Sequence, residues 1–113
     1  GDINNQVTGV RGLSSPTRGV FAGGGSPTRV NVIDFVTIAT EGNAIDFGDM
    51  AVLNEYDGRS CANRTRYVHQ GGSSTDNVMQ FVEIATTGNT QDFGDLVVGR
   101  RGHASISNGH GGL

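Results

Sequence analysis

Tryptophan and lysine are absent from this chain, and cysteine and proline are rare, with 1 and 2 residues. The single cysteine, Cys61, excludes a disulfide within the chain, and its neighbours in GRSCANRT offer no base that would activate a catalytic thiol. Leucine is also scarce, whereas Val, Ile, Thr and Phe are frequent and 19 of the 113 residues are glycine. Because glycine disfavours helices and β-branched residues favour strands, this composition predicts an almost all-β protein.

Charge is low, and positive charge is especially sparse. The formal net charge is −3, all 8 basic residues are arginines, and Arg100-Arg101 is the only basic pair. This balance predicts no nucleic-acid partner and no attachment to an anionic membrane. No apolar run reaches the length of a transmembrane helix. The first residues, GDINNQV, have neither the charged nor the apolar part of a signal peptide.

What the chain does contain is a repeat. Residues 31–53 (NVIDFVTIATEGNAIDFGDMAVL) align without a gap with residues 77–99 (NVMQFVEIATTGNTQDFGDLVVG), and 14 of 23 positions are identical. Residues 11–25, 57–72 and 101–112 share a looser plan that ends in Gly-Gly. We therefore expect one repeat array over 1–113: a partial repeat (1–25), a full repeat (26–72), and a second full repeat with the start of the next (73–113). A fixed period of this size is typical of solenoids, propellers and arrays.

The pattern VxxFVxIAT in each copy predicts a strand that is covered on both faces, because adjacent apolar residues point to opposite sides of a strand. A sheet packed between two neighbouring sheets has this pattern. The polar exceptions, Asp34/Gln80 and Thr37/Glu83, differ between copies and are expected at partly exposed or interface positions. TEGN (40–43) and TTGN (86–89) predict hairpin turns in which Gly and Asn supply positive φ angles.

The order of these features resembles the kelch repeat, a unit of roughly 50 residues that forms one four-stranded blade of a β-propeller. The matching positions are Arg101-Gly102-His103, Gly71-Gly72, Asn77 to Phe81 and Phe93, and in the other copy Gly24-Gly25, Asn31 to Phe35 and Phe47. The resemblance implies kelch-like antiparallel blades. Kelch repeats carry Trp at the aromatic position, where this chain has Phe47 and Phe93.

More narrowly, IATTGNxxDFGDLxV (84–98) resembles a repeat of marine phage and bacterial proteins of structural or adhesive type. This resemblance implies a virion-surface or extracellular location, a role in assembly or in receptor and glycan contact, and no chemistry. Since propellers typically have 4–8 blades, about two and a half repeats cannot close a ring. We expect other copies, or the rest of a longer repeat chain, to complete a ring or fibre. The alternative fold is a small β-sandwich.

The motif DFGD occurs in both copies, and we interpret it as structural. In this hypothesis each Phe anchors a blade, each Gly lets the chain turn, and the aspartates accept bonds from turn N–H groups or pair with Arg18 and Arg66. The motif residues are Asp46, Phe47, Gly48 and Asp49, and Asp92, Phe93, Gly94 and Asp95.

Two chemical alternatives remain for the same motif. A repeat-associated calcium site would use the oxygens of Asn43, Asp46, Asp49, Asn89, Asp92 and Asp95. A glycosidase would need two carboxylates facing each other across a sugar, but an active site duplicated in every repeat is unexpected. We therefore predict no enzymatic activity and no cofactor.

A carbohydrate-binding module is the alternative function. It would use an exposed aromatic residue among polar ones, and the cluster that qualifies is Glu55, Tyr56, Asp57 and Arg59. His69, His103 and His110 share no metal-ligand spacing and are expected to be solvated. Asn63-Arg64-Thr65 is a glycosylation sequon. The favoured function is a non-enzymatic structural or adhesion module built from the repeats.

Overall fold

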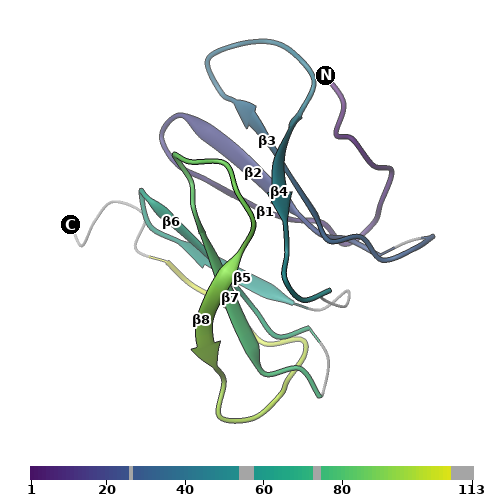
Figure 1. Cartoon of the computed structure of the whole chain (residues 1–113), viewed down its shortest axis with the longest axis vertical. Coiled ribbons are helices and arrows are strands. Elements are labelled where there is room, and N and C mark those ends of the chain that lie inside the picture. Colours follow the sequence, from purple (N-terminus) through teal and green to yellow (C-terminus); the bar gives the residue numbers. More distant parts are fainter. Residues whose placement is uncertain (26, 54–57, 73–74, 108–113) are drawn as a thin grey trace.

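The protein is all-β in the part that the computed structural model describes, which is residues 1–25, 27–53, 58–72 and 75–107. Two four-stranded antiparallel sheets follow one another along the chain, with strand orders β1-β2-β3-β4 and β5-β6-β7-β8 (Figure 1). The strands of the first sheet are β1 (Arg11–Ser14), β2 (Arg18–Ala22), β3 (Val32–Thr37) and β4 (Ile45–Asp49). Those of the second are β5 (Arg59–Ala62), β6 (Arg66–Gln70), β7 (Val78–Glu83) and β8 (Gln91–Asp95).

Each sheet spans parts of two of the repeat units expected from the sequence. The unit 26–72 contributes β3 and β4 to the first sheet and β5 and β6 to the second. Strands β1 and β5 make contacts between the sheets, and the molecule is flat, with extents of 40 × 39 × 21 Å. No helix among the described residues is long and apolar enough to cross a membrane.

The predicted strand after each Asn-Val is confirmed, and so is its burial on both faces in the first sheet. Ile33, Asp34 and Phe35 are buried in succession on β3. One hydrophobic cluster extends through both sheets, from Val20 and Phe47 in the first to Tyr67 and Ile84 in the second. The two sheets therefore share one core, which stabilises their arrangement.

The loops after β3 and β7 join antiparallel neighbours, so the predicted hairpins are confirmed, but the predicted backbone angles of their asparagines are wrong. Gly42 and Gly88 have positive φ, but no described residue other than glycine does, so Asn43 and Asn89 do not adopt that conformation. The glycine pairs after β2 and β6 do have positive φ, at 66° and 117° for Gly23 and Gly24. Glycine adopts these angles without the steric cost that a Cβ would bring.

A β-bulge places the anchor aromatic of each sheet. Ile33 pairs with Gly48 and Asp34 with Asp46, which leaves Phe47 as the extra residue of β4. Phe47 is 2% exposed and meets Phe35 edge to face at 5.8 Å between ring centroids. The corresponding pair, Phe81 and Phe93, has the same geometry at 5.9 Å.

Phe93 nevertheless is 48% exposed. The expectation that both phenylalanines anchor a blade core is thus correct for Phe47 and wrong for Phe93. The reason is positional: the second sheet covers Phe47, and no described element packs on Phe93 in the same way.

This difference predicts unequal costs of truncation. Phe47→Ala should lower the free energy of unfolding by about 3–4 kcal/mol, because it opens a cavity in the shared core. Phe93→Ala removes the same atoms from a half-exposed site and should cost about 1 kcal/mol. Urea denaturation of both variants measures the difference. Equal losses would show that Phe93 is as buried in solution as Phe47.

Candidate functional site

The most specific feature of the molecule is the junction where the end of the first sheet meets the β7–β8 loop of the second. The amide of Gly88 donates to the carbonyl of Phe47 at 2.7 Å, and Thr90 N donates to the carbonyl of Asp49 at 2.9 Å. Between them, the backbone N–H of Asp49 donates to Asn89 Oδ1 at 2.9 Å. The turn asparagine therefore uses its side chain to bind the preceding sheet.

Gly48 makes this approach possible. A Cβ at position 48 would lie 2.4 Å from the carbonyl oxygen of Gly88, and the φ of Gly48 is +147°. The sequence hypothesis that this glycine lets the chain turn is therefore wrong. Gly48 lies inside β4, beside the bulge, where the backbones of two sheets meet.

Gln80 completes the junction from the interior of β7. Its Oε1 accepts bonds from Ala51 N at 3.0 Å and from Thr90 Oγ1 at 2.6 Å, and its Nε2 donates to the carbonyl of Val52 at 3.0 Å. The side chain is 1% exposed. The buried amide of Gln80 thus supplies hydrogen-bond partners to backbone groups of Ala51 and Val52, which follow β4. Burying these backbone groups without partners would be unfavourable.

The same junction occurs a second time, at the N-terminus. Asp2 N donates to Asn43 Oδ1 at 3.1 Å, and Ala44 N donates to the carbonyl of Asp2 at 2.8 Å. Asn4 N donates to Asp34 Oδ2 at 3.1 Å. Residues 1–4 therefore bind the first sheet as residues 48–51 bind the second. The polar strand residues Asp34 and Gln80 lie at these interfaces, as predicted, but they are buried rather than partly exposed.

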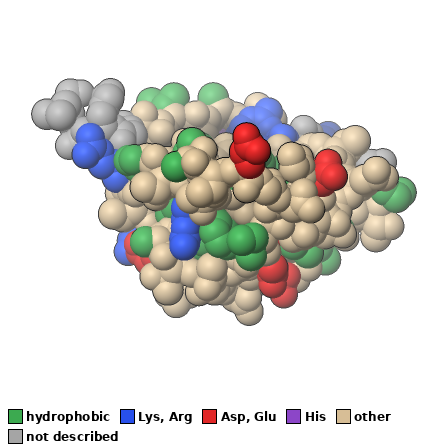
Figure 2. Space-filling view, turned by 90° about the horizontal axis from the view of Figure 1, so that it is seen from above, with side chains coloured by type: hydrophobic (Ala, Val, Ile, Leu, Met, Phe, Trp, Pro, Cys, Tyr) green, Lys and Arg blue, Asp and Glu red, His purple; other side chains and the backbone are tan. Residues whose placement is uncertain are grey.

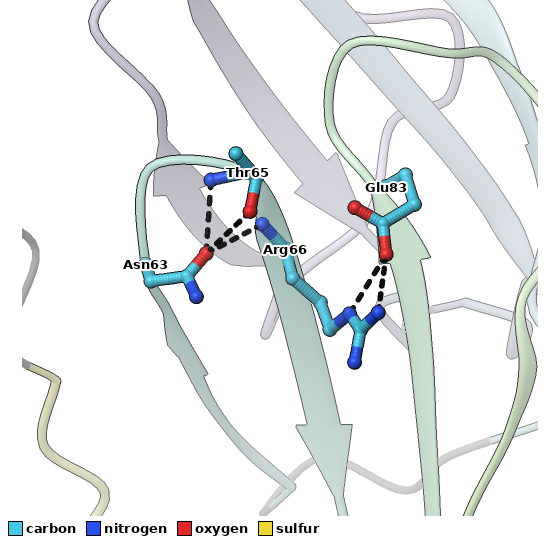
Figure 3. Close-up of polar contacts among 4 residues, drawn as sticks. All are labelled: Asn63, Thr65, Arg66 and Glu83. Atoms are coloured by element: carbon cyan, nitrogen blue, oxygen red, sulfur yellow. Dashed lines mark hydrogen bonds and ion pairs between the residues drawn. The ribbon is translucent and has the colours of Figure 1, made fainter. Parts of the chain in front are cut away.

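The arginines on β2 and β6 differ in what they bind. Both guanidinium groups lie 4.5 Å from the centre of a phenylalanine ring, Arg18 over Phe35 and Arg66 over Phe81. Arg18 also donates to the carbonyl of Ile84 in the second sheet at 2.8 Å. Arg66 instead forms an ion pair with Glu83 at 2.7 Å (Figure 3).

These partners replace the predicted pairing of the two arginines with the DFGD aspartates. Asp46, Asp49, Asp92 and Asp95 all have exposed side chains. A local bond to a backbone N–H, as the sequence suggested, is present for Asp92, whose Oδ1 accepts from Gly94 N at 3.0 Å.

For the calcium alternative, the structure gives other partners to the asparagines. Asn43 and Asn89 use their Oδ1 atoms to accept the backbone N–H groups of Asp2 and Asp49. Among the described residues no group of three or more His, Cys, Asp and Glu could hold a metal ion. In the face shown in Figure 2, charged side chains are scattered rather than gathered into a patch of one sign.

The proposed sugar cluster falls mostly outside the described residues, since Glu55, Tyr56 and Asp57 are not among them, and neither is His110. Arg59 lies at the start of β5, half-buried, and donates to the carbonyl of Gly58 at 3.1 Å. Cys61, also half-buried on β5, is a free thiol. At the glycosylation sequon, Asn63 accepts bonds from the backbone N–H groups of Thr65 and Arg66 at 2.9 and 2.7 Å (Figure 3).

His69 is buried, although the sequence predicted a solvated histidine. It is 2% exposed, and its Nδ1 lies 3.0 Å from the hydroxyl of Tyr67. Its Nε2 is buried and has no hydrogen-bond partner among the described residues. Burial, followed by the positive charges of Arg11 and His103, lowers the pKa of His69 to about 4. Burial likewise lowers the pKa of His103, with Arg59 and Arg100 adding to the effect.

The first prediction from this site concerns the close approach at Gly48. Gly48→Ala introduces both backbone strain and a clash with Gly88, whereas Gly94→Ala introduces strain at a φ of +133° and, among the described residues, only an ordinary van der Waals contact with Met79. We expect Gly94→Ala to cost about 1–2 kcal/mol and Gly48→Ala about 2 kcal/mol more. Chemical denaturation measures both. Equal costs would mean that the sheets do not meet at Gly48.

The second prediction concerns acid. Because the pKa of His69 is lower in the folded protein than its ordinary value of 6.5, the unfolded chain binds the proton more readily. The contribution of neutral His69 to the free energy of unfolding is therefore fully present above pH 6.5 and decreases as the pH falls toward 4. Between pH 7 and pH 5 the loss should be about 2 kcal/mol. His69→Gln, which cannot titrate, should show a clearly smaller loss, and an unchanged wild-type stability over this range would contradict the buried, neutral histidine.

Comparison with known proteins identifies no family for this chain. No protein-family model matches the chain, and no curated protein matches it. The duplicated junction is therefore the feature that bears most directly on function: in it, a Gly-Asp segment binds the asparagine of a turn, and the next residues bind a buried polar side chain.

Proposed function

We propose that this protein is a non-enzymatic structural module, an array of kelch-like β-propeller blades that joins further copies into a ring or fibre on a virion or secreted surface. The observation that carries the proposal is the duplicated junction. Two different segments, 1–4 and 48–51, bind two different sheets through equivalent backbone and side-chain atoms. A contact repeated with each sheet is suited to extension by further sheets, and an active site needs no such repetition.

The arrangement of the sheets supports the propeller part of the proposal. Each sheet is a four-stranded antiparallel meander, the form of a propeller blade. The first strands of the two sheets, β1 and β5, lie in contact, as the inner strands of neighbouring blades do around a central axis. The placement on a virion or secreted surface is supported by the resemblance of residues 84–98 to repeats of structural and adhesive proteins.

The exposed apolar side chains support association as well. Ile38, Phe93 and Val98 are 57%, 48% and 59% exposed, and each belongs to the repeated segments that pack between the sheets elsewhere in the chain. Exposed apolar surface of this kind marks a place where another protein surface packs.

The proposal predicts self-association. Light scattering on a size-exclusion peak, measured across a dilution series, should give masses above the 11.8 kDa of one chain, and these masses should fall on dilution. A closed ring gives one defined oligomer, and a fibre gives open-ended species. A mass of 11.8 kDa at every concentration would show that the chain does not assemble with itself.

A further inference from the structure

The two sheets present opposite open faces that correspond to the two sides of the junction between them. The Phe93 face, on the second sheet, consists of Arg66, Phe93, Gly94, Asp95 and Val98. These residues repeat Arg18, Phe47, Gly48, Asp49 and Val52, which bind the second sheet. The Phe93 face is therefore a second copy of a binding surface whose first copy is occupied.

The Ile38 face, on the first sheet, consists of Asp34, Ile38, Asn43 and Ala44. Its counterparts in the second sheet are Gln80, Ile84, Asn89 and Thr90, which receive the first sheet. Ile84 is 1% exposed, whereas Ile38 is 57% exposed. The polar part of the Ile38 face is occupied by residues 1–4, and its apolar part is open.

We propose that the Phe93 face of one copy of this chain binds the Ile38 face of a second copy, with Gly94-Asp95 replacing Gly1-Asp2 at Asn43. The inference rests on the assembly proposed above and gives it a geometry. Its template is the internal junction, in which the same residue types already meet. The occupant is a second copy because this chain itself carries the complementary face.

The backbone at Gly94 is accessible for this contact. Among the described residues, only the Cε atom of Met79 lies near a Cβ at Gly94, at 3.9 Å, so none of them covers on Gly94 the surface that Gly88 covers on Gly48. Phe81, whose ring contacts Phe93 and Arg66, lines a hollow of about 240 Å³ together with residues that include Glu83 and Asn89. In the internal junction the corresponding ring, Phe35, belongs to the core cluster that contains Ile84. Ile38 of the second copy would occupy this hollow.

The polar groups are also matched. Asp95 N would donate to Asn43 Oδ1 and Val97 N to the carboxylate of Asp34, as Asp49 N and Ala51 N donate to Asn89 and Gln80. Asp34 lacks the N–H group with which Gln80 binds the carbonyl of Val52. Ala44 likewise lacks the hydroxyl with which Thr90 accepts the N–H of Ala51. The contact between copies thus forms at least two hydrogen bonds fewer than the internal junction and should be the weaker of the two.

Such a contact is heterologous, because two different faces meet. Heterologous contacts form rings when the rotation closes and open filaments when it does not. They also leave one unused face of each kind at the two ends of any open assembly, which permits a test by mixing.

The test uses one variant for each face. Ile38→Asp places a charge on the Ile38 face and leaves the Phe93 face intact, and Phe93→Asp does the reverse. Each variant alone should remain at 11.8 kDa, and an equimolar mixture should form a complex of twice that mass, because one intact face of each kind remains. Ile106→Asp is the matched control: Ile106 is 92% exposed, and neither the two faces nor the lining of the hollow includes it.

Circular dichroism checks that each variant is folded, and Val98→Asp replaces Phe93→Asp if the loss of the Phe81 contact unfolds the second sheet. If the wild type associates and both variants associate equally well, the docking is wrong and the proposed assembly stands on other surfaces. If the wild type associates, a mixture that stays at 11.8 kDa while each variant is folded also overturns the docking.

Removal of residues 1–5 separates the docking from the proposed assembly. The shortened chain should associate more tightly than the full chain, because the Gly1-Asp2 segment no longer competes for Asn43. If the full chain is a monomer at every concentration, the assembly of the full chain fails as a function, and association of the shortened chain still supports the docking. A shortened chain that is folded and monomeric overturns it.

Discussion

The stacking of the two sheets depends on one backbone approach that a side chain at position 48 would prevent. Gly48 meets the carbonyl of Gly88 where a Cβ would lie 2.4 Å away. The bulge beside it turns Phe47 into the shared core and leaves its carbonyl free to accept the amide of Gly88. Apolar packing and a directed hydrogen bond therefore fix the same point. Hydrophobic contact alone is not directional, so the bond sets the relative position of the sheets.

Polar residues inside the strands also fix the position of the segment that connects the sheets. A chain that leaves one sheet and crosses the next carries backbone groups that no strand neighbour pairs. Gln80 supplies both an acceptor and a donor to residues 51 and 52, and Asp34 supplies acceptors to Asn4. A polar residue in the middle of an otherwise apolar strand thus has a structural explanation in each sheet: it replaces the backbone partner that the connection lacks.

The repeat predicted much of this architecture, because repeated apolar patterns identify strands and repeated glycines identify special backbone geometry. Strands β3 and β7, the all-β class and the interface position of Asp34 and Gln80 follow from the sequence. The role of Asn43 and Asn89 could not be predicted, since a side-chain bond to a segment 40 or more residues away leaves no local sequence pattern. The burial of His69 could not be predicted either, because no other repeat has a histidine at this position.

Identical residues in the two copies differ in environment because burial depends on the neighbour and not on the repeat alone. Phe47 and Phe93 have the same local geometry, and only the adjacent sheet distinguishes them. Glu83 reflects the same asymmetry. Arg18 binds the carbonyl of Ile84, whereas Arg66, with no described sheet beyond it, pairs with Glu83, where the first copy has Thr37.

An exposed ion pair of this kind contributes little stability, typically below about 1 kcal/mol. Arg66 could therefore exchange Glu83 for a backbone carbonyl of another sheet, as Arg18 binds Ile84, at little cost in free energy. Charged residues at open surfaces also discourage indiscriminate sheet association. The second sheet thus combines an apolar, glycine-containing surface with a charged pair beside it. In the assembly that we propose, the apolar surface would bind the next copy, and the charged pair would disfavour pairing with other sheets.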